Sequence, residues 1–168
     1  MSGKAYIKTP RVFDIKKKIE ADSAKIEKAL IDTLYYVGES CIKEARYNGD
    51  YNDITGNLRS SIGYVVLKNG SVLKTSRPEL FVGKGEPKTS ANGTSKPNNG
   101  AEGVRTMRKA LKQLAAEAPQ GLVLIVAAGM KYAIYVEARF GKNVLTSSKL
   151  LAEQLVPDIL RQLGFRTR

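Results

Sequence analysis

Apolar residues recur at helical spacing through the first third of the chain. Between Asp14 and Arg46 most steps are three, four or seven residues, which places these side chains along one face of a helix. We therefore predict a single long helix over this range, with one face toward a core. Gly38 in its centre either weakens the helix by about 1 kcal/mol relative to alanine or permits a close approach. The apolar face comprises Ile15, Ile19, Ile26, Leu30, Leu34, Val37, Cys41 and Ala45.

Turn-forming residues and a hairpin signal follow this helix. The run YNGDYNDITG predicts a loop, and Thr55 or Asp53 can cap a short helical turn over Leu58–Ser61. The segments IGYVVLK and SVLKT then have the composition of strands. Asn69-Gly70 between them predicts a two-residue hairpin, because both residues tolerate positive φ.

The composition changes sharply from Ser76 to Gly103. Gly, Pro, Ser, Asn and Lys dominate this range, which has almost no apolar residues after Val82. We predict a long projecting loop, with residues 80–82 as a short strand or an anchor at its base. A second helix is expected over Ala101–Ala118. Its apolar face carries Val104, Met107, Leu111, Leu114 and Ala118, and its opposite face carries Arg105, Arg108, Lys109 and Lys112.

The last third of the chain contains one clear strand, one ambiguous segment and one helix. GLVLIVAAG is an aliphatic run typical of a buried strand, whereas KYAIYVEARFG fits either a helix or a strand. Ser147 or Ser148 can cap a final helix that runs to about Leu163, is kinked at Pro157 and ends at Gly164. The predicted fold class is α+β: a small antiparallel sheet packed against a long N-terminal helix, a middle helix and a C-terminal helix.

Composition limits the chemistry that this chain can perform. Its 168 residues predict one domain, 1–168, with a basic N-terminal arm (1–13) and a long inserted loop (76–103). Histidine is absent, and Cys41 is the single cysteine, which excludes zinc sites built on these residues and Ser-His or Cys-His nucleophiles. We interpret Cys41 as a small core residue. Because no intrachain disulfide can form, an intracellular protein is the default expectation.

No targeting or membrane segment is recognisable in the sequence. The N-terminal segment MSGKAYIKTPRVFDIKKK lacks the apolar region of a signal peptide. The longest apolar run, LVLIVAAGM, falls far short of the ~20 residues that span a bilayer. We therefore expect a soluble protein without membrane contact.

Two patterns with potential chemistry do not match known sites. VGKGEPKTS has the residue types of a phosphate loop but not its spacing, and no helix opens directly behind it. The acidic pairs Glu39/Glu44 and Asp50/Asp53 form no recognisable acid–base or metal-binding set, and the two aspartates are expected to shape their loop. We therefore expect no enzyme and no cofactor. Glu137 stands in an otherwise apolar stretch and is expected to pair with an arginine.

The net charge of +12 points to an acidic partner or to a solvated basic surface. Basic residues concentrate near both ends of the chain and on the middle helix. The aromatic residues that mark a platform for single-stranded nucleic acid are missing from these clusters. The candidate contacts to DNA or to an acidic partner are Lys16, Lys17, Lys18, Arg105, Arg108, Arg166 and Arg168.

Two segments resemble motifs of one family of phage proteins. YNDITGNLRSSI, and KYAIYVEARFGK about seventy residues later, are similar to segments of the tail-completion (tail-to-head joining, or neck) proteins of tailed bacteriophages. In that family a D-x-T-G-x-L-R-x-S-I segment follows a long helix and leads into a hairpin, and Y-A-x-Y-V-E-x-G precedes the C-terminal helix. The matching residues are Asp53, Thr55, Gly56, Leu58, Arg59, Ser61, Ile62, Tyr132, Ala133, Tyr135, Val136 and Glu137.

The resemblance implies a structural subunit of a ring, typically a hexamer at a tail or a dodecamer at a portal. Such a ring joins the head to the tail and surrounds the DNA channel, so its partners would be portal or adaptor proteins, tail or adjacent ring proteins and double-stranded DNA. The expected location is the neck or tail of the virion, after synthesis in the host cytoplasm. The alternative is a basic module that binds nucleic acid without sequence preference.

We expect Thr55, Gly56, Leu58 and Ile62 to set the geometry of the turn and its anchoring in the core. Arg59 is expected to project from this turn and to pair with Glu137, within the subunit or across an interface. The candidate residues of the subunit interface are Arg59, Glu137, Arg77, Phe81, Lys84, Lys88, Tyr132 and Tyr135.

Overall fold

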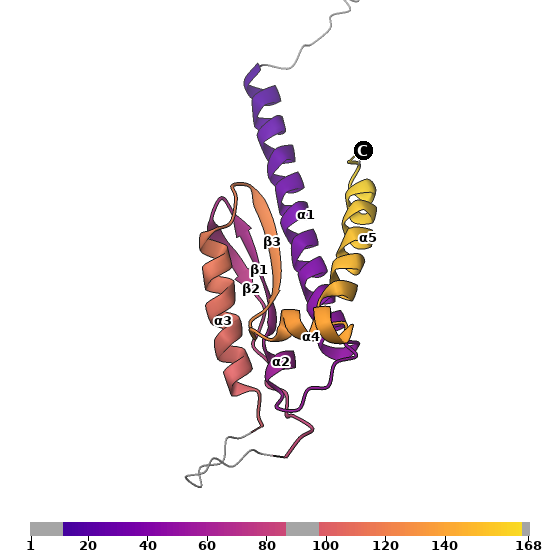
Figure 1. Ribbon diagram of the computed structural model, residues 1–168. Coiled ribbons are helices and arrows are strands. Elements are labelled where there is room, and N and C mark those ends of the chain that lie inside the picture. Colours follow the sequence, from indigo (N-terminus) through magenta and orange to yellow (C-terminus); the bar gives the residue numbers. More distant parts are fainter. Residues whose placement is uncertain (1–11, 87–97, 166–168) are drawn as a thin grey trace, which may run out of the picture.

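The computed structural model describes residues 12–86 and 98–165. The predictions for Lys88, Arg166, Arg168 and most of the N-terminal arm therefore lie outside the described residues. The described part is an α+β fold, as predicted, with five helices and one three-stranded antiparallel sheet (Figure 1). Its elements are α1 (Val12–Tyr47), α2 (Asn57–Ser60), β1 (Ile62–Lys68), β2 (Ser71–Thr75), α3 (Ala101–Ala116), β3 (Leu122–Ala128), α4 (Ala133–Phe140) and α5 (Thr146–Gln162).

The sheet lies between α3 and α1, and α5 runs antiparallel along α1 (Figure 1). The strand order is β2-β1-β3, so β1 is central and is buried on both faces. Alternate side chains of a strand point to opposite faces. Accordingly Tyr64 and Val66 pack with α1 in one hydrophobic cluster, and Val65 and Leu67 pack with α3 in another.

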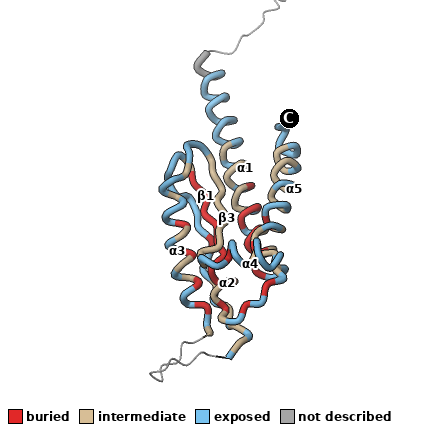
Figure 2. The backbone as a smooth tube through the Cα atoms, viewed as in Figure 1, coloured by how far each residue is buried: buried red, intermediate tan, exposed pale blue. Residues whose placement is uncertain are grey.

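The apolar face of α1 is buried only in its C-terminal half, which corrects the prediction of one continuous core-facing stripe. Val37, Cys41 and Ala45 are buried, but Ile15, Ile19 and Ile26 are 45%, 63% and 48% exposed. Figure 2 shows the projecting half of α1 as exposed. The cause is length: 36 helical residues span about 54 Å, whereas a seven-residue strand spans about 24 Å, so α1 extends past the sheet.

Gly38 permits a close approach between α1 and the sheet, the second of the two expectations for it. A Cβ atom at this position would lie 2.8 Å from the ring of Tyr64. The Tyr64 hydroxyl donates to the Glu39 carboxylate at 2.8 Å. The glycine therefore fixes the depth at which the Tyr64 ring packs beneath the helix.

The remaining elements follow the sequence pattern, with one correction. Asn69 and Gly70 have φ of 50° and 78°, as the hairpin prediction requires. The ambiguous segment forms helix α4, and α5 continues through Pro157. The aliphatic strand β3 is an edge strand and is partly exposed throughout, so the prediction of a buried strand is wrong.

Candidate subunit interface

The base of the long loop packs against the end of α1 through Phe81. The Phe81 ring meets the Tyr47 ring edge to face, with centroids 5.7 Å apart. The guanidinium groups of Arg46 and Arg59 lie 5.9 Å and 5.5 Å from the Phe81 ring centroid. Phe81 is thus the anchor expected at the loop base, although no strand forms there within the described residues. We call Arg46, Tyr47, Arg59, Glu79 and Phe81 the loop-base cluster.

Arg46 holds this cluster together from inside the protein. It is only 3% exposed, and its Nη2 donates to the backbone carbonyl of Ile62 at 2.7 Å. Its Nη1 donates to Glu79 at 3.0 Å, and the Tyr47 hydroxyl donates to the same carboxylate at 2.6 Å. Arg46 and Glu79 were not among the residues predicted from the sequence. The available signal was the helical spacing of Arg46, which comes four residues after Ile42 and lies on the same face of the helix.

The Asp53–Gly56 turn is bonded directly to the loop base. The backbone N–H groups of Lys84 and Gly85 donate to the carbonyls of Asp53 and Ile54 at 3.1 Å and 2.9 Å. Gly56 has a φ of 74°, and a Cβ atom there would lie 1.8 Å from the carbonyl oxygen of Phe81. Only glycine fits at this close approach between the turn and the loop base, as expected of a residue that sets the turn geometry.

Both predicted capping residues contribute to α2. The Leu58 N–H donates to Asp53 Oδ1 at 3.3 Å, and the Asn57 N–H donates to Thr55 Oγ1 at 3.4 Å. The side chains of Leu58 and Ile62 are buried in the core, as expected of the residues that anchor the turn.

Arg59 does not project from the surface, and it does not pair with Glu137 within the subunit. Its side chain is 23% exposed and lies over the rings of Tyr51 and Phe81, with Nε 4.0 Å from Asp53 Oδ2. The short α2 helix turns this side chain toward the loop base and not toward solvent. Burial raises the pKa of Asp53, although Arg59 and the backbone N–H groups at the turn oppose the shift.

Glu137 caps α5 in place of the predicted caps Ser147 and Ser148, and it forms no ion pair with an arginine among the described residues of its own subunit. Its Oε1 accepts the backbone N–H groups of Leu145 and Thr146 at 3.0 Å and 2.7 Å, and the Thr146 hydroxyl at 2.6 Å. A short connection joins α4 to α5, so Glu137 lies over the first N–H groups of α5. Partial burial acts to raise the pKa of Glu137, but the hydrogen bonds from Thr146 and Leu145 together outweigh it and lower the pKa.

We expect Glu137→Ala to lower the free energy of unfolding by about 1–2 kcal/mol at neutral pH, because α5 loses its cap and a favourable charge at its N-terminus. Glu137 contributes fully to the free energy of unfolding at pH values above its unfolded-state pKa. This contribution is lost as pH falls through the lower pKa of the folded state. Urea unfolding at neutral and acid pH tests this. The difference between wild type and Glu137→Ala should shrink in acid, and a difference independent of pH would contradict the charged cap.

Helix α4 exposes an apolar surface, which we call the α4 surface: Tyr132, Ile134, Tyr135 and Phe140. These residues are 39%, 75%, 45% and 60% exposed. The rings of Tyr135 and Phe140 meet edge to face, with centroids 5.5 Å apart. Tyr132 and Tyr135 therefore do not belong to the core of the subunit. Exposed large apolar groups that lie this close together in the chain are typical of a contact surface.

The basic candidates lie on separate parts of the molecule. Lys16, Lys17 and Lys18 are exposed on the projecting half of α1, at the end opposite the loop (Figure 1). Arg77 and Lys84 are exposed near the loop base. The candidate interface residues thus do not form one patch: Arg59 and Phe81 meet, whereas Tyr135 and Glu137 belong to α4 and Tyr132 is its N-cap residue.

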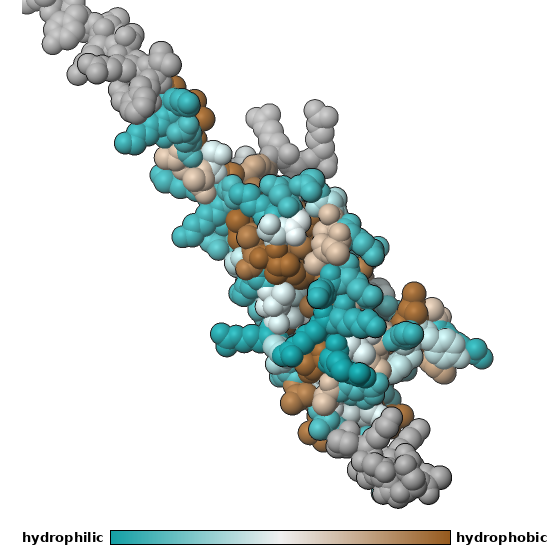
Figure 3. Space-filling model, turned by 90° about the vertical axis from the view of Figure 1, so that its left-hand side faces the viewer, coloured by the Kyte–Doolittle hydropathy of each residue, from teal (hydrophilic) through white to brown (hydrophobic). Residues whose placement is uncertain are grey.

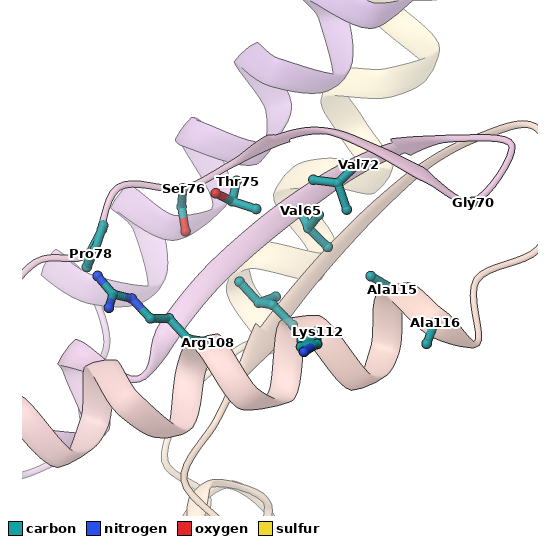
Figure 4. A pocket seen from close by; sticks show the side chains of 11 residues that line it. Val65, Gly70, Val72, Thr75, Ser76, Pro78, Arg108, Lys112, Ala115 and Ala116 are labelled. Atoms are coloured by element: carbon teal, nitrogen blue, oxygen red, sulfur yellow. The ribbon is translucent and has the colours of Figure 1, made fainter.

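The basic side chains of α3 are divided between two sides of the helix. Arg108 and Lys112 border an apolar groove of about 440 Å³ between α3 and β2, where Arg108 points toward Pro78 (Figure 4). Lys109 lines a different groove, beside Lys131. Figure 3 shows apolar surface interrupted by polar side chains on the α3 side of the molecule. The expected basic face of α3 is therefore not a continuous charged surface.

The described residues form an α+β fold with exposed apolar and basic surfaces. Within the described ranges, no group of three or more acidic or cysteine side chains is arranged to hold a metal ion. No helix in this part of the chain has the length and hydropathy needed to cross a membrane. Comparison with protein-family models, curated proteins and solved structures found no match to this chain.

Proposed function

We propose that the protein is a structural subunit of a ring in the neck or tail of a tailed bacteriophage, which joins the head to the tail around the DNA channel. The observation that carries this proposal is the α4 surface. Three large apolar side chains are exposed on a helix of eight residues, and a fourth, that of Tyr132, is exposed at the N-cap of the same helix. This helix lies within the second segment that resembles the tail-completion proteins.

A closed ring requires two different patches on each subunit that meet head to tail. The α4 surface is one such patch. The loop-base cluster supports a second, because it fixes the entry of the long loop next to the exposed Arg77 and Lys84. The projecting half of α1, with Ile15, Ile19 and Ile26 exposed, adds apolar surface that the subunit itself leaves uncovered.

We expect Ile134→Asp to weaken ring formation by about tenfold or more while leaving the fold intact, because Ile134 is 75% exposed and a charge there opposes burial in a contact. Native mass measurement and electron microscopy, with and without portal or tail-tube assemblies, provide the readout. Val72→Asp is the control, since Val72 is an apolar residue that is also exposed, at 53%, on β2. A wild-type chain that never forms a ring would overturn the proposal, and rings unaffected by Ile134→Asp would overturn the role of α4.

The second candidate function is non-specific binding of nucleic acid. It is favoured by the exposure of Lys16, Lys17 and Lys18 together with Arg105 and Arg108. It requires that the isolated chain bind DNA with an affinity that falls steeply as salt rises, because bound lysines and arginines release counterions from the phosphates. Binding measured over a salt series decides between the two functions: a flat slope or no binding at low salt removes the second.

A further inference from the structure

The two edges of the sheet differ in how well they are protected from pairing with another strand. Edge strands usually avoid such pairing through short length, bulges, charged residues or proline. Strand β2 has five residues, contains Lys74, and shows a register shift opposite Val66 and Leu67. Strand β3 has none of these devices: its seven residues LVLIVAA pair with β1 in unbroken register.

The free edge of β3 presents an evenly spaced row of backbone donors and acceptors. At the ends of the strand the Gly129 N–H donates to the Ser61 carbonyl, and the Asn69 N–H donates to the Gly121 carbonyl, both at 2.9 Å. Antiparallel pairs alternate between bonded and non-bonded positions. The odd-numbered residues of β3 therefore bond to β1, and the even-numbered residues point their N–H and C=O groups outward. These are Leu122, Leu124, Val126 and Ala128.

This outward edge is accessible. All seven residues of β3 are partly exposed. No side-chain hydrogen bond, and no backbone hydrogen bond from outside the sheet, reaches the four outward residues within the described part of the chain. Unpaired edge groups of this kind are ready to bond to another strand.

We propose that β3 pairs antiparallel with β3 of a second copy of this chain, about a twofold axis at Ile125. In this register Leu124 lies opposite Val126 of the partner subunit, and Leu122 lies opposite Ala128 of the partner subunit. Each copy offers four N–H and four C=O groups, so all sixteen groups are satisfied by eight hydrogen bonds. The two sheets then form one six-stranded sheet.

A second copy fits this edge better than β2 of a neighbour does. On β2 the outward N–H groups belong to Val72 and Thr75, which lie opposite the non-bonded positions Leu67 and Val65. Because of the bulge, these two residues are three positions apart in the sequence, whereas the outward residues of β3 are two positions apart. The outward hydrogen-bonding groups of β2 and β3 therefore do not align. The β3 row is self-complementary, and no charged residue within either strand opposes the pairing. The contact is isologous and forms a dimer, separate from the head-to-tail contact of the proposed ring.

Amide hydrogen exchange over a dilution series tests the pairing without any substitution. We expect the amides of Leu124 and Val126 to be protected at high protein concentration and to exchange rapidly on dilution. The amides of Val123 and Ile125 bond to β1 and should stay protected throughout. Rapid exchange of Leu124 and Val126 at all concentrations would overturn the proposal.

The variant Val126→Pro removes an outward N–H and leaves the bonds to β1 in place. It should raise the dimer dissociation constant by about tenfold or more, measured by sedimentation equilibrium. Thr75→Pro removes an outward N–H from the β2 edge and is the matched control, expected to leave the dimer unchanged. Ala128→Pro, which alters little side-chain packing, replaces Val126→Pro if that chain fails to fold. Equal weakening by Thr75→Pro would contradict the twofold contact and indicate head-to-tail edge pairing.

Discussion

Replacing Gly56 with alanine should lower the free energy of unfolding by about 3–5 kcal/mol and release the base of the long loop. Two causes combine at this position. The φ of 74° is costly for any residue with a Cβ atom. The added Cβ would also lie 1.8 Å from the carbonyl oxygen of Phe81, so the loop backbone must move. That movement separates Phe81 from Tyr47 and the two arginines beneath it.

The control for Gly56→Ala is Gly70→Ala, measured by the same urea unfolding experiment. Gly70 has a similar φ of 78°, but a Cβ atom there has no neighbour within 4 Å. Gly70→Ala therefore reports the backbone cost alone, about 1–2 kcal/mol. The additional loss of unfolding free energy in Gly56→Ala, relative to Gly70→Ala, measures the cost of the clash with the backbone of Phe81. If both variants lose the same free energy, Phe81 does not constrain the turn.

Arg46→Ala should lower the free energy of unfolding by about 2–4 kcal/mol. The substitution leaves the buried Ile62 carbonyl without the side-chain donor at 2.7 Å, removes the ion pair to Glu79 and leaves a void beside Phe81. The amides of Lys84 and Gly85, which bond to the Asp53–Gly56 turn, should then exchange faster with solvent, because the loop base loses its anchor.

Two further variants separate the causes of that loss. Arg105→Ala removes an arginine with 79% side-chain exposure that pairs only weakly with Glu102, and it should change stability by no more than about 0.5 kcal/mol. Arg46→Met keeps much of the side-chain volume and loses the donors, so it isolates the hydrogen bonds from the packing. If Arg46→Met has the same free energy of unfolding as the wild type, the hydrogen bond to Ile62 makes no net contribution to stability.

Local patterns were sufficient to predict the fold class and most elements. The helical spacing of α1 and α3, the Asn69-Gly70 turn and the strand segments on either side of it depend on neighbours within a few residues, and the structure has them where the sequence places them. The extent of burial could not be predicted in the same way. Ile15 and Ile19 continue the apolar spacing of α1, but whether they meet a core depends on where the sheet ends.

The candidate site was predicted less well, because its contacts join residues far apart in the chain. Arg59 and Glu137 were each expected to pair with an opposite charge, but both have other polar or aromatic neighbours that spacing alone does not reveal. Arg59 lies beside Asp53 and over the Phe81 ring, while Glu137 accepts hydrogen bonds from the N-terminus of α5. Thr55, Gly56 and Leu58 were predicted correctly because a turn is a local structure.

The central position of β1 has a consequence for how the protein unfolds. Tyr64 and Val66 belong to the cluster beneath α1, and Val65 and Leu67 belong to the cluster beneath α3. The two halves of the core thus share one strand, and neither can melt while the other keeps its native packing. We therefore expect the sheet, α3 and the packed half of α1 to unfold in a single cooperative transition, and the projecting half of α1 to lie outside it.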